Sequence, residues 1–299
     1  MIQLSKELVA RGHEVEVYCL PFMLKDGGKL DPEKELGDIP YHEGYFHNVK
    51  ADVTYIMYSP LNWLNFNTRK PRIAGFHSHC YWQPINRKYG ILPNISNIVH
   101  RLIGDIELER FNAIHVLTDF YKINHDNVFY IPNFVDGSQF YKCNEKYPEF
   151  TVGYASRKVW QKGYDIYQKI KKMNLEGIKF IETTGKIPEN KLPEWYSKVH
   201  VLLNTSRVDT FGLAIVEPLF CGTPVIASDI DTHRALDVGL RFAVTPLGYI
   251  QEINKLKTEF DLGNYRRIEE SCRLLSSRFE KKKVMDELEK MLESVSNEK

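Results

Sequence analysis

Apolar and polar positions alternate along this chain in a way that predicts a mixed α/β protein. The second half contains five short apolar runs, bounded by polar turns, which is the pattern of buried parallel strands. Stretches with helical spacing separate these runs, so we expect strands and helices to alternate and the strands to form a parallel sheet. The five runs are TVGYAS (151–156), IKFIETT (178–184), VHVLLN (199–204), PVIAS (224–228) and RFAVT (241–245).

Both ends of the chain carry helical patterns. Residues 1–11 predict a helix that ends at Gly12, and 14–20 predicts a strand directly after it. Residues 279–295 predict another helix, with apolar side chains at helical spacing: Val284, Leu288, Met291, Leu292 and Val295.

The length of 299 residues suggests two domains, and no repeat or long Gly/Ser-rich linker interrupts the chain. We expect a first Rossmann-like domain over 1–142 and a second over 148–276. The polar segment KCNEKYPEF (142–150) would join them.

Composition narrows the classes of partner. The formal charge is +1 and no dense basic tract occurs, which argues against a nucleic-acid partner. The sequence contains no run of 18 apolar residues, the length that could span a bilayer. The amphipathic stretch 94–104 is compatible with peripheral membrane contact as well as with ordinary helix packing. The five cysteines lack a metal or redox spacing, which favours a reducing compartment such as the cytoplasm.

The most informative stretch is DTFGLAIVEPLFCGTPVIASD (209–229). It places Asp209 and Glu217 eight positions apart around a Phe-Gly-Leu turn that opens an apolar helix. The run before it predicts a strand, so the turn leaves the carboxyl end of a strand, where helix amides attract phosphate. Each carboxylate can accept hydrogen bonds from vicinal hydroxyls, as a sugar or ribose offers. Without its surroundings, such a pair would be explained by a helix cap and a solvated glutamate.

This stretch resembles the E-x7-E donor-site motif of retaining glycosyltransferases with the GT-B fold, especially family four (glycosyl transferases group 1). The residues Gly222, Pro224, Val225, Ile226 and Ala227 fit the motif's continuation. The resemblance implies two Rossmann-like domains that face a cleft, and a C-terminal helix, about 277–299, that crosses back to pack on the first domain.

Two cations precede the motif in the order that the family shows. Arg157 ends the run TVGYASR, and Lys162 is followed by Gly163 before a helical stretch. The resemblance implies that Arg157 and Lys162 bind the donor diphosphate and stabilise the charge on the leaving nucleotide. Taken alone, the pair would be two surface cations.

Two segments of the first half also resemble the family. IPNFVDGSQF (131–140) is similar to the segment that closes the N-terminal domain, with Phe134 where the family usually has Gly. PRIAGFHSHC (71–80) looks like the strand followed by a His near the acceptor and the reacting carbon. His77 fits best, and His79 is the alternative.

Three departures from the family pattern bear on activity. The family's first strand and glycine-containing loop have no counterpart before residue 1, so we expect either a late start or a shortened homologue. Asp209 replaces the usual first Glu and is one methylene, about 1.5 Å, shorter. Pro218 follows Glu217 inside the expected helix, which predicts a kink or a late helix start.

The resemblance implies transfer of a hexose from a nucleoside-diphosphate sugar, of the GDP-mannose or UDP-glucose type, to an acceptor hydroxyl with retention of anomeric configuration. Glu217 would hold the ribose, Asp209 the donor-sugar hydroxyls, and the amides of Phe211, Gly212 and Leu213 the sugar and phosphate. The acceptor would be a glycan, a lipid-linked molecule or a small molecule. We expect no metal cofactor, because the cations compensate the phosphate charge; a metal at Asp229 and Asp231 is a weaker interpretation.

Two other functions stay open at this point. The chain could be a nucleotide-sugar-binding homologue that is inactive because of its shortened N-terminus. It could also be another GT-B enzyme, such as a nucleotide-sugar epimerase or a phosphorylase.

Overall fold

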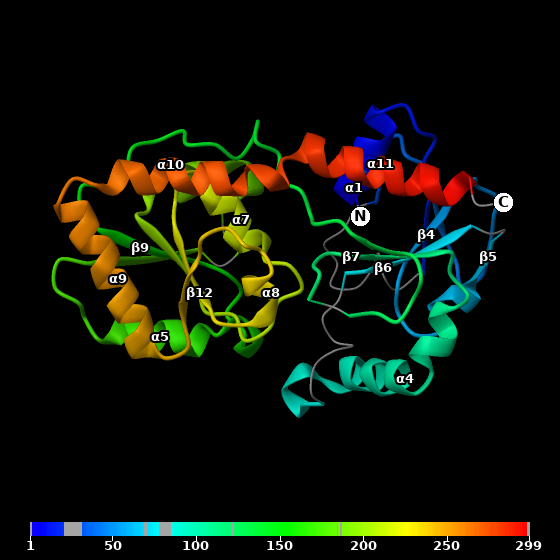
Figure 1. Cartoon of the computed structure of the whole chain (residues 1–299), viewed down its shortest axis with the longest axis horizontal. Helices are drawn as coiled ribbons and strands as arrows, with labels where there is room; N and C mark the ends of the chain where they lie inside the picture. The colour runs from blue at the N-terminus through cyan, green and yellow to red at the C-terminus, as the bar shows by residue number, and fades with distance from the viewer. Residues whose placement is uncertain are drawn as a thin grey trace.

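The computed structural model describes residues 2–20, 32–68, 71–77, 85–120, 122–183, 185 and 187–297. It has two lobes side by side, each with its own parallel sheet (Figure 1). Helices near the C-terminus run along the upper edge from one lobe to the other. The assignment of 1–142 and 148–276 to separate domains stays our proposal.

The second lobe contains a five-stranded sheet in the order β10-β9-β11-β12-β13. All four pairings are parallel, so the five strands expected from the sequence and their orientation are confirmed. The chain moves outward from β9 to β10 and then returns to the other side of β9 for β11. This reversal places a topological switch point between β9 and β11, where open α/β sheets bind ligands. The strands are β9 (Thr151–Ala155), β10 (Lys179–Thr183), β11 (Val201–Asn204), β12 (Val225–Ser228) and β13 (Arg241–Ala243).

Helices cover both faces of this sheet, which explains why its strands are apolar throughout. On one face, Leu202 packs with residues of α7 and α10; on the other, Val201 and Leu203 pack with residues of α5 and α9. All four residues of β11 are therefore buried. The helices are α5 (Tyr164–Lys172), α6 (Leu192–Lys198), α7 (Leu213–Phe220), α8 (Asp231–Arg234), α9 (Pro246–Asp261) and α10 (Tyr265–Ser276).

The first lobe contains a four-stranded parallel sheet in the order β4-β6-β7-β8. The helix and strand expected at the start of the chain are present as α1 (Ile2–Ala10) and β1 (Val17–Cys19), and β1 pairs with β2 outside that sheet. The other elements are α3 (Pro32–Leu36), β2 (Tyr41–Glu43), β3 (His47–Val49), β4 (Thr54–Met57), β5 (Phe66–Thr68), β6 (Arg72–Phe76), α4 (Ile91–Leu108), β7 (Ala113–Val116) and β8 (Val128–Tyr130).

The C-terminal helix α11 (Lys281–Asn297) returns to the first lobe, as the resemblance implies (Figure 1). Its buried side chains pack with Ile73, Ala113 and Ile131 of that lobe. The sequence placed Leu292 on this face, but Leu292 is only partly buried, and Met285, which the sequence pattern missed, is fully buried. Lys281 adds ion pairs to Glu7 and Asp136, at 2.9 and 2.7 Å.

One local expectation changes. Helix α7 begins at Leu213, directly after Gly212, so the late helix start expected from Pro218 is wrong. Pro218 lies inside this eight-residue helix, which ends two residues later at Phe220. Phe134, which stands where the family usually has Gly, does not have a positive φ; the non-glycine residues with positive φ in the described part of the chain are Leu61, Asn174 and Asp237.

Met285→Ala should lower the free energy of unfolding by about 2–5 kcal/mol, because it removes a fully buried side chain between α11 and the first lobe. Urea unfolding followed by circular dichroism measures the change. The exposed Glu287→Ala on the same helix is the control and should stay within about 0.5 kcal/mol of the wild type. Equal effects of the two substitutions would contradict this packing.

Candidate functional site

Two helix N-termini open at the carboxyl edge of the second sheet. Helix α5 follows β9 through the turn at Lys162 and Gly163, and α7 follows β11 through the loop that ends at Gly212. Both N-cap positions are glycines that provide no side-chain cap. Because β9 and β11 are neighbours, both sets of helix amides lie at the switch point, where they favour an anion.

A close backbone contact holds these two loops together. A Cβ atom on Gly163 would lie 1.8 Å from the carbonyl oxygen of Thr205, and Gly163 has a φ of +63°. The Thr205 hydroxyl donates to the carbonyls of Lys162 and Gly163, at 3.1 and 2.9 Å. Glycine is therefore required here both by space and by backbone angle.

Lys162 and Asp209 form the central charge pair of the site. Lys162 Nζ lies 3.0 Å from Asp209 Oδ2, and the amide of Thr210 donates to Asp209 Oδ1 at 3.0 Å. Burial alone would raise the pKa of Asp209, but His233 and Lys162 beside it outweigh burial and hold that pKa well below its usual range. Asp209 is therefore ionised at neutral pH and can accept a hydrogen bond from a ligand hydroxyl.

His233 on α8 is a residue of this site that the sequence analysis missed. The ring is fully buried, and Nδ1 lies 2.9 Å from the carbonyl oxygen of Ser228. Since a carbonyl only accepts, Nδ1 carries a hydrogen. Nε2 has no hydrogen-bond partner among the described residues and lies 3.8 Å from Asp209 Oδ2. A ligand hydroxyl between Nε2 and Asp209 would give this nitrogen a hydrogen-bond partner. The position of His233 just after β12 was the signal that could have found it.

Glu217 lies on α7, one turn from the same N-terminus. Tyr196 of α6 donates from its hydroxyl to Glu217 Oε2 at 3.0 Å. Burial raises the pKa of Glu217 to about 7; the hydrogen bond from Tyr196 opposes this rise, and the charge of Glu189 adds to it. A buried carboxylate without a cation is ready to accept ligand hydroxyls, which would restore its solvation. The sequence pattern gave no signal for Tyr196.

Arg157 and the apolar motif residues take different positions. Phe211 and Gly212 are buried, and Leu213 is exposed at the helix start. Arg157 follows β9 at the same sheet edge, but its side chain is exposed and makes no ion pair with any residue in the described ranges. The structure thus joins Lys162 to Asp209 and leaves Arg157 at the surface.

In the first lobe, His77 follows β6 and ends a chain of three polar side chains. His115 Nε2 lies 2.8 Å from the carbonyl oxygen of Ile131, so it donates there, and His115 Nδ1 accepts from the Tyr55 hydroxyl at 2.6 Å. The Tyr55 oxygen then accepts from His77 Nε2 at 2.8 Å. This order leaves His77 Nδ1 as the nitrogen with a lone pair. His79 lies outside the described residues.

Burial keeps both histidines of this chain neutral. It lowers the pKa of His77 to about 3, with a further contribution from His115, and it lowers the pKa of His115 to about 4. Gly75 makes room for the arrangement, because a Cβ atom there would lie 2.0 Å from the Tyr55 hydroxyl. His77 is therefore a fixed, neutral hydrogen-bonding group rather than a cation.

The lobes meet beside the site. The Gln161 amide donates to the carbonyl of Lys88 at 3.0 Å, and Lys88 Nζ lies 4.8 Å from the Trp160 ring centroid. These contacts join the segment before α4 to the turn that carries Lys162.

Asp229 of the Asp229–Asp231 segment forms an ion pair with an arginine. Arg234 binds both carboxylate oxygens of Asp229, at 2.5 and 2.6 Å. In the part of the chain that the structure describes, no three His, Cys, Asp or Glu side chains are grouped so that they could hold a metal ion.

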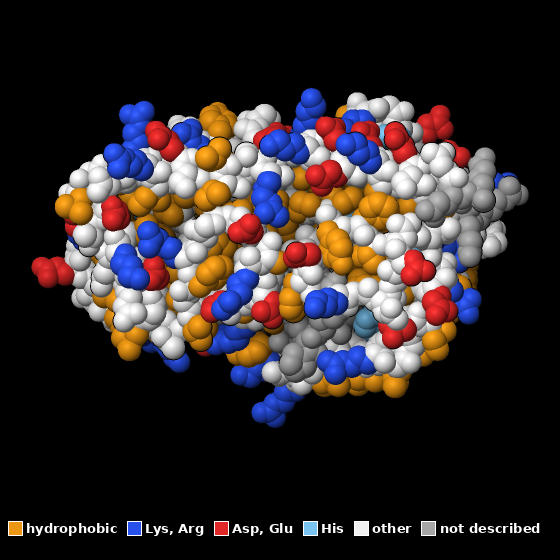
Figure 2. Space-filling model, viewed as in Figure 1, with side chains coloured by type: hydrophobic (Ala, Val, Ile, Leu, Met, Phe, Trp, Pro, Cys, Tyr) orange, Lys and Arg blue, Asp and Glu red, His pale blue; other side chains and the backbone are white. Residues whose placement is uncertain are grey.

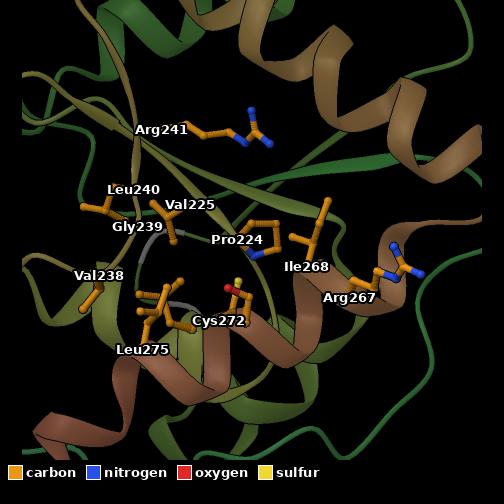
Figure 3. Close-up of a pocket in the computed structure, with 12 residues that line it drawn as sticks. Pro224, Val225, Val238, Gly239, Leu240, Arg241, Arg267, Ile268, Cys272 and Leu275 are labelled. Atoms are coloured by element: carbon orange, nitrogen blue, oxygen red, sulfur yellow. The ribbon is translucent and has the colours of Figure 1, made fainter.

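A separate cavity of about 250 Å³ lies between α10 and the β12–β13 side of the sheet (Figure 3). Its lining includes Val238, Leu240, Cys272 and Leu275, and none of the site residues above. Its one arginine from the sheet, Arg241, is paired with Glu252 at 3.2 Å. The charged and hydrogen-bonding groups lie at the carboxyl edge instead, so that edge is the better candidate for the site.

Comparison with known proteins finds a family match within the second lobe. Residues 152–258 match the family described as Glycosyl transferases group 1. A stretch of 85 residues is 29% identical to O-antigen chain mannosyltransferase B of Escherichia coli, and it covers 28% of this chain and 21% of that protein.

Solved structures with the same architecture cover nearly the whole chain. A glycosyltransferase from Rickettsia africae aligns over 100% of this chain and 94% of its own, with a TM-score of 0.74 and 14% identity. Sucrose-phosphate synthase from Thermosynechococcus elongatus aligns over 98% of this chain and 91% of its own, with a TM-score of 0.68 and 16% identity. The Anabaena protein HepE, in complex with UDP and glucose, aligns over 98% of this chain and 94% of its own, with a TM-score of 0.65 and 16% identity. The fold is therefore GT-B.

Gly163→Ala should be more destabilising than Gly263→Ala, and urea unfolding measures both. The two glycines have positive φ, +63° and +75°, so each substitution strains the backbone by about 1 kcal/mol. Only Gly163 faces the Thr205 carbonyl, which adds about 1–3 kcal/mol of overlap; nothing lies within 4 Å of the added Cβ at Gly263. Equal losses would show that the two loops are not in contact.

Relative to the wild type, Glu217→Gln should be more stabilising at pH 8 than at pH 5. The native pKa, about 7, exceeds the ordinary 4.5, so the protonated carboxyl contributes stability below pH 4.5 that is lost as pH rises through 7. The variant lacks this loss, which is on the order of 2 kcal/mol. Unfolding at both pH values tests it, with the exposed Glu176→Gln as control. No pH-dependent difference between Glu217→Gln and the control would contradict the burial of an uncompensated carboxylate.

Proposed function

We propose that this chain, a GT-B protein whose second lobe carries a group 1 glycosyltransferase sequence, transfers a hexose from a nucleoside-diphosphate sugar to an acceptor hydroxyl. The observation that carries the proposal is the carboxyl edge between β9 and β11. Two uncapped helix N-termini, one fixed lysine and two carboxylates meet there. Phosphate, leaving-group charge and sugar hydroxyls are the groups that this combination recognises.

The donor would bind with its diphosphate at the helix N-termini. The amides at Phe211, Gly212 and Leu213 and the ammonium of Lys162 would face the phosphate oxygens, and Arg157 could close over them from the surface. Glu217 would accept the ribose hydroxyls, which supports its retention as a buried carboxylate with a raised pKa. Donors of the GDP-mannose and UDP-glucose types both fit these contacts.

Asp209 and His233 would recognise the transferred sugar together. Asp209 is ionised, and His233 Nε2 lies 3.8 Å from it without a partner among the described residues. A sugar hydroxyl between them would donate to Asp209 and contact His233 Nε2. Both oxygens of Asp209 already accept hydrogen bonds, from Lys162 and Thr210, which favours a stabilising role over that of a nucleophile.

Catalysis would rest on positioning and on charge stabilisation. Lys162 would neutralise the charge that develops on the departing diphosphate, so we propose a reaction that needs no metal ion. Transfer would proceed through an oxocarbenium-like transition state with retention of configuration. His77, held neutral by Tyr55 and His115, would face the acceptor and the reacting carbon from the first lobe. We propose that the reaction uses nucleotide sugars of the cytoplasm.

Calorimetry with UDP, GDP and ADP tests the donor site and identifies the base. Lys162→Ala should weaken binding of the preferred nucleotide about 10–100-fold, because it removes a charge-assisted contact to phosphate. Glu217→Ala should weaken it about ten-fold or more, through the ribose. Arg157→Ala should have the smaller effect of an exposed cation.

The matched control is Lys257→Ala. Lys257 pairs with Asp261 at 2.7 Å and its side chain is 27% exposed, close to the 22% of Lys162, but it lies on α9 away from the carboxyl edge. Its removal should leave binding unchanged. If a folded chain binds no nucleotide, or if the control weakens binding as much as Lys162→Ala does, the site is wrong. Product analysis with the donors of the preferred base then separates transfer from epimerisation.

A further inference from the structure

Helix α4 of the first lobe turns its aliphatic side toward solvent. Six residues, which we call the α4 ridge, are each between 41% and 79% exposed. Their spacing places them along one side of an 18-residue helix about 27 Å long. A surface helix normally buries such a stripe. The α4 ridge consists of Ile91, Leu92, Ile95, Ile98, Leu102 and Ile106.

The opposite side of α4 is buried and carries two polar side chains beside the core residue Leu108. Asn97 and Glu107 are 2% and 3% exposed, and Gly104 lies between them on the same face. The Tyr58 hydroxyl donates to Glu107 Oε2 at 2.9 Å and accepts from His100 Nδ1 at 3.0 Å. Sequence periodicity shows that this helix is amphipathic, but it does not show that the polar side faces the protein.

These contacts fix the outward direction of the α4 ridge. Glu107 Oε1 also accepts from the backbone amide of Leu61, so both of its oxygens are engaged by the lobe. Gly104 leaves the space that His100 occupies, since a Cβ atom there would lie 2.6 Å from His100 Nδ1. Rotating the ridge inward would leave Glu107 without these partners, which is costly for a buried carboxylate.

Cations accompany the ridge. Arg87, Lys88, Arg101 and Arg110 are exposed in and around α4, against the two exposed carboxylates of Asp105 and Glu109. Figure 1 shows α4 as the outermost helix along the lower edge of the first lobe, and Figure 2 shows hydrophobic side chains along that edge with Lys and Arg side chains beside them. The surface is a protruding aliphatic edge with a cationic excess.

We propose that the α4 ridge docks on an anionic lipid bilayer. A helix lying in the interface plane buries an aliphatic side at the boundary of headgroups and acyl chains, while neighbouring cations meet the lipid phosphates. A convex ridge of Ile and Leu needs no shape-complementary groove for this contact. Protein interfaces, in contrast, are enriched in aromatic residues, Met and Arg at their centres.

Docking would also orient the first lobe. His100 of α4 lies against Phe76, at a ring-centroid distance of 6.0 Å, and Phe76 directly precedes His77. The bilayer would therefore lie on the side of the lobe where β6 ends. The proposal goes beyond sugar transfer and does not depend on it, because lipid binding is measured without a donor.

Cosedimentation with vesicles tests the proposal, using vesicles of phosphatidylcholine alone and of phosphatidylcholine and phosphatidylglycerol in equal parts. The full chain should bind the mixed vesicles more strongly, and added salt should reduce the difference. Leu102→Glu should weaken binding at least about ten-fold, because it removes an inserted leucine and adds a charge that the lipid repels. Arg101→Glu should weaken binding to the mixed vesicles selectively.

The matched control is Leu274→Glu. Leu102 and Leu274 are both 74% exposed, but Leu274 lies on α10 of the second lobe. It should leave vesicle binding unchanged, and the circular dichroism of both variants should match that of the wild type. Equal vesicle binding by the Leu102 and Leu274 variants would overturn the proposal. So would sedimentation velocity, without vesicles, that shows a dimer which Leu102→Glu dissociates.

Discussion

The contact between Gly163 and the carbonyl of Thr205 is the constraint on which the candidate site depends. It brings the turn after β9 against the loop after β11, so that two helix N-termini open at one place. The strand order makes this contact possible, because the chain reverses direction across the sheet between these two strands. Lys162, one residue before the glycine, is thereby carried to Asp209, and the charge pair follows from the backbone rather than from the side chains alone.

Several polar groups around this contact are kept where folding alone does not favour them. Glu217 is buried without a cation, and His233 has a buried nitrogen with no partner among the described residues. In the first lobe, burial keeps His77 and His115 neutral within a chain of hydrogen bonds. Groups of this kind gather at functional sites because ligand atoms complete their hydrogen bonds. The cavity beside Cys272, whose lining residues Figure 3 shows, lacks them.

The parallel strands of the second lobe could be predicted from the sequence because they are buried on both faces and therefore read as continuous apolar runs. Asp209 and Glu217 could be found from their spacing around the Phe-Gly-Leu turn that follows such a run, and Lys162 from the resemblance to the family. Tyr196, Tyr55 and His115 could not, because their roles arise from contacts between elements distant in the chain. The direction of α4 was equally hidden: periodicity reports that a helix has two sides, and only the buried partners of Glu107 decide which side faces inward.

The crystal structure of the complex with the preferred nucleoside diphosphate tests the central claim most directly. The account predicts the diphosphate at the N-terminus of α7, within hydrogen-bond distance of the amides at Gly212 and Leu213 and of Lys162 Nζ, with the ribose hydroxyls on Glu217. A nucleotide bound in the cavity between α10 and the β12–β13 side of the sheet, or one whose phosphates lie away from both helix N-termini, would contradict it.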